Sequence, residues 1–190
     1  MMNLLFHCCC APCALACVKY FSDEGIEPAL FWYNPNIHPF TEYKSRKDTL
    51  VGFAQTKKLK LLLPDSQEQP ENGYGLKPFI IAVFNEMENI DGRRCKLCYS
   101  MRLEKTAEFA ANNGFNTFST SLLISPYQNH DEIRRAGEEA AVKYGVDFYY
   151  NDFRPLFRQG QNEARSSGLY MQKYCGCIFS EEEKGAHRWH

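Results

Sequence analysis

Residues 3–33, NLLFHCCCAPCALACVKYFSDEGIEPALFWY, predict the beginning of an alternating α/β fold. A short apolar run at 3–6 is followed by a helical pattern at 12–22 and by a second apolar run at 29–33. A strand, a helix and a strand in this order form a βαβ unit, in which the two strands lie parallel. The stretch therefore predicts a sheet built from parallel strands.

The rest of the chain continues the same alternation. Its patterns predict helices over 43–56, 77–88, 94–112 and 131–144, and strands over 59–63, 115–120 and 146–150, the first of these three being buried. Residues 65–75 are polar and rich in proline and glycine, which predicts a loop. We expect one α/β domain over residues 1–190, with a mainly parallel, Rossmann-like sheet covered by helices on both faces.

Unusual residues follow the predicted strands directly. They lie at 7–10, 34–36, 125–128 and 152–154. Because sheets of this kind bind ligands at the carboxyl ends of their strands, these residues are expected to gather on one rim. The cysteines among them predict a metal site there.

The composition excludes several classes of protein. The 190 residues are 44% hydrophobic and 24% charged, which is typical of a globular chain and excludes a disordered or fibrous one. A net charge of -1 gives no general positive field, although local basic patches can still bind a phosphate backbone. The N-terminus has no basic leader, and no run of 18 apolar residues occurs, so we expect a soluble, cytoplasmic protein without a membrane partner.

The nine cysteines fall into three tight clusters. These are Cys8, Cys9, Cys10, Cys13 and Cys17, then Cys95 and Cys98, then Cys175 and Cys177. Their odd number and the lack of a recognisable secretion signal make a disulfide framework the weaker explanation. A role as small buried hydrophobic residues would not explain the clustering. The clusters therefore indicate metal binding or redox chemistry.

Two of the clusters together offer a site with four thiolates. Cys95 and Cys98 lie three residues apart at the start of a predicted helix, on one face, where both sulfurs can reach one metal. Adjacent Cys9 and Cys10 need an irregular turn, which a junction between strand and helix before Pro12 supplies. Four thiolates suit a structural zinc or an iron-sulfur cluster. The adjacent pair is an awkward chelate for zinc and favours the cluster.

The remaining cysteines have different expected roles. Cys175 and Cys177, separated by one glycine, can close into a strained and readily reduced disulfide, with metal ligation as the alternative. Cys13 lies one helical turn from Cys10 and could face the site. For Cys8 and Cys17 we expect structural roles.

Six spaced motifs between residues 4 and 180 resemble those of the QueH family of epoxyqueuosine reductases. They are HCCCAPC at 7–13, FWYNPNIHP at 31–39, CKLC at 95–98 with Arg102 and Leu103, LLISPYQ at 122–128, DFR at 152–154 and YCGCIFS at 174–180. One departure is Cys8, which stands at a variable position of the first motif and adds a local excess of thiols.

The resemblance implies a cobalamin-independent oxidoreductase of the last step of queuosine biosynthesis, the deoxygenation of the epoxide of epoxyqueuosine in tRNA to queuosine. It implies a 4Fe-4S cluster held by Cys9, Cys10, Cys95 and Cys98, and a redox-active pair, Cys175 and Cys177. A second metal, an additional iron ion, is conceivable on spare groups such as Cys13. The expected partners are tRNA bearing epoxyqueuosine and an electron donor of ferredoxin or flavodoxin type.

Further residues are candidates for contacts with the substrate. The proposed proton donors are His7, Tyr127 and Asp152; Asn34 and Asn36 would hold the base; and Arg93, Arg94, Arg102 and Arg154 would contact phosphates. A structural role on the rim is the alternative for His7.

Two other functions compete with this one. An ATP-dependent tRNA sulfur-transfer enzyme would need a glycine-rich phosphate loop after the first strand, where this chain has cysteines and no glycine. A zinc-stabilised RNA-binding module without catalysis would use the same thiols. It would be colourless, whereas a protein with an iron-sulfur cluster would be brown.

Overall fold

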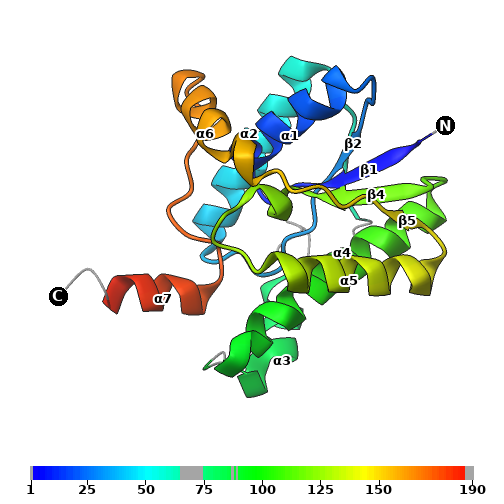
Figure 1. Cartoon of the computed structure of the whole chain (residues 1–190). Helices are drawn as coiled ribbons and strands as arrows, with labels where there is room; N and C mark the ends of the chain where they lie inside the picture. The colour runs from blue at the N-terminus through cyan, green and yellow to red at the C-terminus, as the bar shows by residue number, and fades with distance from the viewer. Residues whose placement is uncertain (1, 65–74, 87, 89, 187–190) are drawn as a thin grey trace.

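The computed structural model describes residues 2–64, 75–86, 88 and 90–186, and within them five strands form one fully parallel sheet (Figure 1). The strand order is β3-β2-β1-β4-β5. The strands are β1 (Leu4–His7), β2 (Ala29–Phe31), β3 (Leu61–Leu62), β4 (Thr117–Thr120) and β5 (Asp147–Phe148). The predicted α/β fold class, with its parallel sheet, is confirmed.

Helices cover both faces of the sheet. On one face lie α1 (Ala11–Asp23), α2 (Phe40–Lys57) and α6 (Phe157–Ser166), and on the other lie α4 (Arg93–Asn112) and α5 (His130–Tyr144) (Figure 1). Two shorter helices, α3 (Leu76–Val83) and α7 (Ile178–Ala186), lie outside these two layers. Short 3-10 turns complete the described elements, at Phe84–Glu86, Ile90–Gly92, Ser121–Ile124 and Arg154–Leu156.

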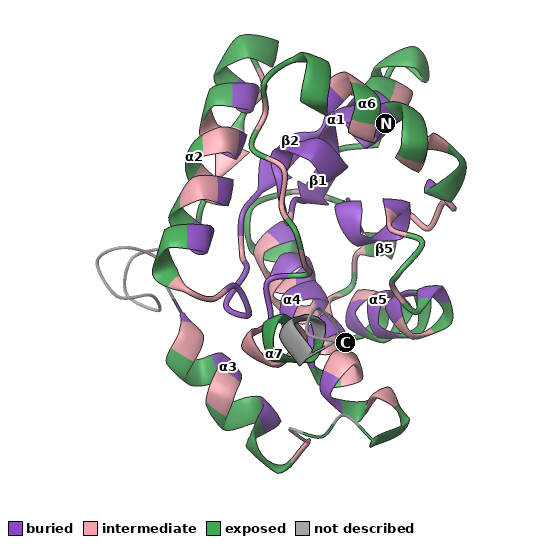
Figure 2. Cartoon of the chain, turned by 90° about the vertical axis from the view of Figure 1, so that its left-hand side faces the viewer, coloured by how far each residue is buried: buried purple, intermediate pink, exposed green. Residues whose placement is uncertain are grey.

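The core lies around β1, the central strand. Leu4, Leu5 and Phe6 are buried, as a strand packed between helices on both sides must be (Figure 2). Phe21 of α1 packs edge to face against Phe6, at 5.2 Å between ring centroids, and against Phe153, at 5.6 Å. These ring contacts pack α1 against β1 and against the chain that follows β5.

Several predicted boundaries differ from the structure. The strands predicted at 29–33 and 146–150 are the shorter β2 and β5, and the helix predicted at 43–56 is the longer α2. The predicted strand at 59–63 is only the two half-buried residues of β3, because it forms the edge of the sheet and has a partner on one side. The helix predicted to reach residue 88 ends at Val83, and a 3-10 turn follows it. Residues 65–74 of the predicted loop lie outside the described residues.

Helices α6 and α7 were not predicted. The buried residues of α6 are Gly160 and Ala164, whose small size leaves no apolar stripe in the sequence. A Cβ atom added at Gly160 would lie 2.8 Å from the Cβ of Ala16 in α1. Gly160 therefore permits the close packing of α6 on α1.

The order of the strands creates a switch point between β1 and β4. From β1 the chain moves outward to β2 and β3, whereas from β4 it moves to β5 on the opposite side. The connections diverge there, so the carboxyl ends of β1 and β4 border a natural binding position. Separately, no helix among the described residues is long and apolar enough to cross a membrane.

We predict that Gly160→Ala lowers the free energy of unfolding by about 1–3 kcal/mol, because the new methyl group must push α6 away from α1. The matched control is Gly52→Ala in α2, where an added Cβ would meet nothing within 4 Å. That change should leave stability unchanged or raise it by up to about 1 kcal/mol. Urea denaturation measures both, and equal stability of the two variants would contradict the packing argument.

Candidate metal centre

The centre begins at the irregular junction between β1 and α1. The peptide N–H of Cys8 donates to the carbonyl of Phe31 over 2.9 Å, and its buried thiol donates to the carbonyl of Phe6. Cys10 precedes α1 with an extended backbone, and Pro12 occupies the first turn of the helix. The junction thus directs Cys8 into the core and leaves Cys9 and Cys10 at the rim.

A second tie joins the junction to β4. The peptide N–H of Cys9 donates to the hydroxyl of Ser121 over 3.0 Å, and Ser121 immediately follows β4. The Cys9 thiol lies at the switch point of the sheet, where the sequence predicted a metal site.

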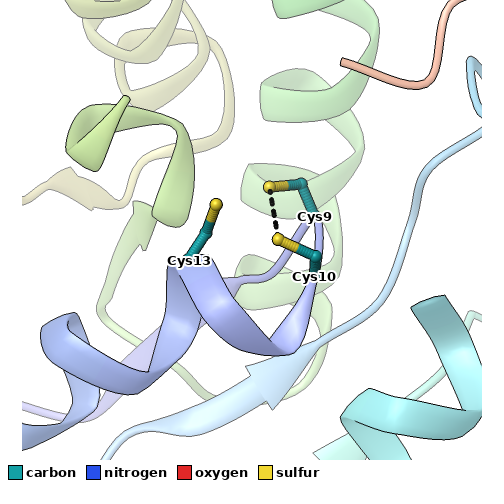
Figure 3. A group of neighbouring side chains, drawn as sticks. All are labelled: Cys9, Cys10 and Cys13. Atoms are coloured by element: carbon teal, nitrogen blue, oxygen red, sulfur yellow. Dashed lines mark hydrogen bonds between the residues drawn. The ribbon is translucent and has the colours of Figure 1, made fainter. Parts of the chain in front are cut away.

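Three thiols converge at this point (Figure 3). The sulfur atoms of Cys9, Cys10 and Cys13 lie within 4.8 Å of one another, and those of Cys9 and Cys10 are 3.8 Å apart. Cys10 and Cys13 are three residues apart at the start of α1, so their side chains share a face. Three soft sulfur donors around one point can bind a metal ion. We call Cys9, Cys10 and Cys13 the thiol group.

Hydrogen bonds concentrate negative charge on Cys9. Bonds with Cys10, Cys13 and Ser121 lower the pKa of the Cys9 thiol well below its usual value. Burial raises the pKa of Cys10, and hydrogen bonding to Cys10 and Cys9 raises that of Cys13. The group therefore holds a thiolate at Cys9 that its neighbours stabilise, which is the protonation state that a metal requires of a ligand.

Two buried arginines lie beside the cysteines. Arg102 is 4% exposed; its Nε donates to the carbonyl of Cys98, and its charge interacts with the thiols of Cys98, Cys9 and Cys175. Arg46 is 2% exposed, and its charge interacts with the thiols of Cys10 and Cys9. Arg102 thus links members of all three cysteine clusters electrostatically.

The second and third clusters meet in a small apolar core. Cys98 and Cys177 pack with Phe79 and Val83 of α3, and burial raises the pKa of Cys98 to about 12. Cys95 is half-buried and Cys175 is exposed. All nine cysteines are free thiols. Among the described residues, only the thiol group brings three ligand atoms this close together, so Cys95 and Cys98 lie outside that compact set.

His7 is buried and both of its ring nitrogens are engaged. Its Nδ1 lies 2.9 Å from the hydroxyl of Thr120, and its Nε2 lies 3.1 Å from the carbonyl of Tyr33. A carbonyl only accepts, so Nε2 carries the proton and Nδ1 accepts from Thr120. Burial lowers the pKa of His7 to about 4, which keeps the ring neutral at pH 7. This placement favours the structural alternative for His7.

The two asparagines of the 34–36 segment are both buried. The side-chain amide of Asn34 donates to the carbonyl of Cys8 over 2.8 Å and so braces the junction. The side-chain oxygens of Asn34 and Asn36 have no hydrogen-bond partner among the described residues. These are unused acceptors close to the predicted binding rim.

The other candidates for substrate contact lie on the surface. Tyr127 is 84% exposed and packs edge to face on Phe157. Asp152 forms an ion pair with Arg154 at 2.6 Å, and the hydrogen bonds from Arg154 lower the pKa of Asp152 to about 2. Asp152 is therefore ionised at neutral pH and has no proton to donate from that state.

The four arginines proposed for tRNA divide into two pairs. Arg93 and Arg154 have exposed side chains. Arg94 is buried, pairs with Glu183 at 2.7 Å and lies over the ring of Phe179. Since Arg94 and Arg102 are engaged inside the protein, only Arg93 and Arg154 are placed to meet a phosphate backbone directly.

Several residues of the site gave no clear signal in the sequence. Arg46 and Glu42 belong to a charged stretch of α2 that resembles a solvated helix face, yet both are buried. Gln172 donates to the sulfur of Cys13 over 3.3 Å from an irregular segment. Ser121 could have been found, because it directly follows a predicted strand.

Comparisons with known proteins agree with these motifs. The family model described as epoxyqueuosine reductase QueH matches residues 4–183. Epoxyqueuosine reductase QueH of Dehalococcoides mccartyi is 37% identical over 96% of this chain and 94% of its own length, and that of Acinetobacter baylyi is 35% identical over 98% and 83%. The relative of the same name from Thermotoga maritima is 33% identical over 97% and 93%.

One solved structure shares the fold. The structure described as a predicted subunit of tRNA methyltransferase from Methanocaldococcus jannaschii superimposes with a TM-score of 0.50 over 90% of this chain and 93% of that chain. At 12% identity the likeness shows the fold alone.

We predict that Cys13→Ser weakens the binding of Cd²⁺ to the metal-free protein by at least about tenfold, because a hard hydroxyl replaces one of three converging soft sulfurs. Absorption by sulfur-to-cadmium charge transfer measures the affinity. Cys17→Ser is the matched control, since Cys17 lies one turn further along α1 and is buried in the core. Equal affinity of the two variants would show that Cys13 is not a ligand.

Proposed function

The chain belongs to the epoxyqueuosine reductase QueH family, and we propose that it is an oxidoreductase that reduces the epoxide of epoxyqueuosine in tRNA to the cyclopentene of queuosine. The observation that supports this reaction best is the thiol group at the switch point, which Arg102 joins electrostatically to Cys98 and Cys175. A reductase that takes its electrons from thiols or from a thiolate-bound metal needs redox-capable sulfur beside its substrate. The sulfur-transfer alternative is disfavoured, because cysteines follow β1 where that enzyme would need a glycine-rich phosphate loop, and because the family model that matches is that of the reductases.

The donor set fits an iron-sulfur cofactor. We propose that Cys9, Cys10, Cys95 and Cys98 hold a 4Fe-4S cluster, in which each thiolate binds a different iron and the four sulfurs need not touch one another. Cys13 would then be the spare thiol for an additional iron ion. When bound, the cluster would supply single electrons, and the additional iron ion would supply a Lewis acid at the rim. Buried Arg102 and Arg46 offset the negative charge of the thiolates.

The third cluster would supply the two-electron step. Opening the epoxide to an alkene consumes two electrons and two protons and releases water. Oxidation of the Cys175 and Cys177 thiols to one disulfide provides two electrons and two protons, so the reaction balances. A donor protein of ferredoxin or flavodoxin type would restore the dithiol. The expected disulfide closes across Gly176, whose φ of 104° suits a tight turn.

The substrate would enter from the exposed side of the rim. Tyr127 offers an exposed aromatic face on which a base can stack. The side-chain oxygens of Asn34 and Asn36 are buried and without a hydrogen-bond partner among the described residues, so a base would have to displace their cover before it could donate to them. Arg93 and Arg154 can bind phosphates, with Asp152 orienting Arg154. Because tRNA is the substrate, we place the reaction in the cytoplasm.

We predict that the protein, purified without oxygen and given a chemical reductant, converts epoxyqueuosine to queuosine in tRNA over many turnovers. Cys175→Ser should keep its iron and sulfide but stop after at most one turnover, because one thiol cannot form the internal disulfide. Mass spectrometry of the digested tRNA and metal analysis give the two readouts. A Cys175→Ser protein that loses its iron would instead make Cys175 a metal ligand.

The same assay tests the whole proposal. A wild-type protein that contains zinc, no sulfide and no reductase activity would favour the zinc-stabilised RNA-binding module. If Cys175→Ser keeps its metal and turns over at the normal rate, Cys175 is neither a redox-active thiol nor a metal ligand.

A further inference from the structure

The segment that carries Cys175 and Cys177 has no regular secondary structure, yet it is docked closely on the protein. It lies between α6 and α7. The peptide N–H of His38 donates to the carbonyl of Gly176 over 2.8 Å, and the hydroxyl of Tyr174 donates to the carbonyl of His38. A Cβ atom at Gly176 would lie 2.9 Å from Ile37. The segment therefore rests directly on residues 37–38, just before α2.

One buried side chain, Arg46 of α2, binds the backbone of this segment. Its Nη2 donates to the carbonyl of Tyr174 over 2.9 Å, and its Nη1 donates to the carbonyl of Cys175 over 3.3 Å. The guanidinium also lies 5.5 Å from the centre of the Tyr174 ring. Two successive carbonyls of the segment thus bind one planar group.

The guanidinium is itself held in place. Its Nε donates to the carboxylate of Glu42 over 2.7 Å, four residues earlier on the same helix. The hydroxyl of Tyr170 donates to the other oxygen of Glu42. A guanidinium presents five donors in a rigid fork and can serve a carboxylate and two carbonyls together, which the compact ammonium of lysine cannot do with the same geometry.

Arg46 also acts on the thiol group. The sulfur charges of Cys10 and Cys9 interact with its guanidinium. The same cation therefore contacts the backbone of the third cysteine cluster and interacts electrostatically with the first. Gln172 of the same segment donates to the sulfur of Cys13 over 3.3 Å, so the segment also touches the thiol group directly.

We propose that Arg46 is a positioning residue that docks the Cys175–Cys177 segment against the thiol group by holding the carbonyls of Tyr174 and Cys175. The inference rests on the proposed function, which assigns the redox step to these two cysteines. Docking keeps the pair at a fixed separation from the first cluster, and Glu42 aims the guanidinium. Arg46 would act through the backbone carbonyls of the segment that carries the redox cysteines.

Hydrogen exchange tests the docking directly. In Arg46→Lys the amide of His38 and the peptide covering 172–178 should exchange at least about tenfold faster than in the wild type, while the amides of β1 and β4 keep their protection. Tyr170→Phe, which frees one oxygen of Glu42, should give a smaller increase in the same place. Lys44→Met is the control, because Lys44 lies on the same helix but its side chain is exposed and pairs with Asp48.

Two results would overturn the inference. One is unchanged exchange at His38 and 172–178 in Arg46→Lys. The other is a uniform rise across β1 and β4 as well, which would make Arg46 a general support of the fold. If Arg46→Lys does not fold, the exchange of Tyr170→Phe tests the inference instead. Tyr170 is 39% exposed, so this variant should fold, and loss of the hydroxyl should still speed exchange in the segment locally.

Activity provides the second readout. In Arg46→Lys we expect kcat for the reduction to fall about tenfold with KM for tRNA unchanged, as a positioning role requires. Exchange needs neither substrate nor turnover. Local loosening in a protein without reductase activity would contradict the proposed function alone, whereas normal turnover with unchanged exchange would contradict this inference alone.

Discussion

The burial of Arg102 is the constraint on which the site depends. A guanidinium in the interior is costly unless negative charge lies beside it, and among the described residues no carboxylate forms an ion pair with Arg102. The charge of Arg102 interacts instead with the sulfurs of Cys98, Cys9 and Cys175. Of these three thiols, Cys9 has the lowered pKa, so the buried guanidinium favours a thiolate at Cys9, and a thiolate is what a metal or a cluster binds.

The parallel sheet positions the cysteines of the thiol group at the carboxyl ends of its strands. Neutral His7 joins the end of β1 to Thr120 of β4 and to the chain after β2, and the N–H of Cys9 reaches Ser121. These bonds fix the strand ends from which the thiol group projects. Arg46 then extends the same arrangement to the C-terminal cysteines, because it contacts their backbone while its charge interacts with Cys10.

Much of this could be predicted from the sequence, for physical reasons that differ between elements. The apolar run of β1 and Pro12 in α1 marked the junction, and the rule for parallel sheets placed its cysteines at the carboxyl edge. The small residues of α6 hid that helix, since Gly160 and Ala164 leave no apolar stripe. Burial of Arg46 could not be foreseen within its charged helix. The burial of Arg102 beside the cysteines could have been predicted, because Arg102 lies one helical turn after Cys98 and so shares its face.

Iron and acid-labile sulfide in the full chain, purified without oxygen, test most directly whether the separate cysteine clusters form one cofactor site. The wild type should contain about four sulfides and four irons per chain, with a fifth iron where the additional ion is bound. Cys98→Ser should lose most of both, because Cys98 belongs to the second cluster and is a proposed ligand, while Cys17→Ser should keep them. A Cys98→Ser protein with full iron and sulfide would contradict the account, since the first cluster would then hold its metal without the second.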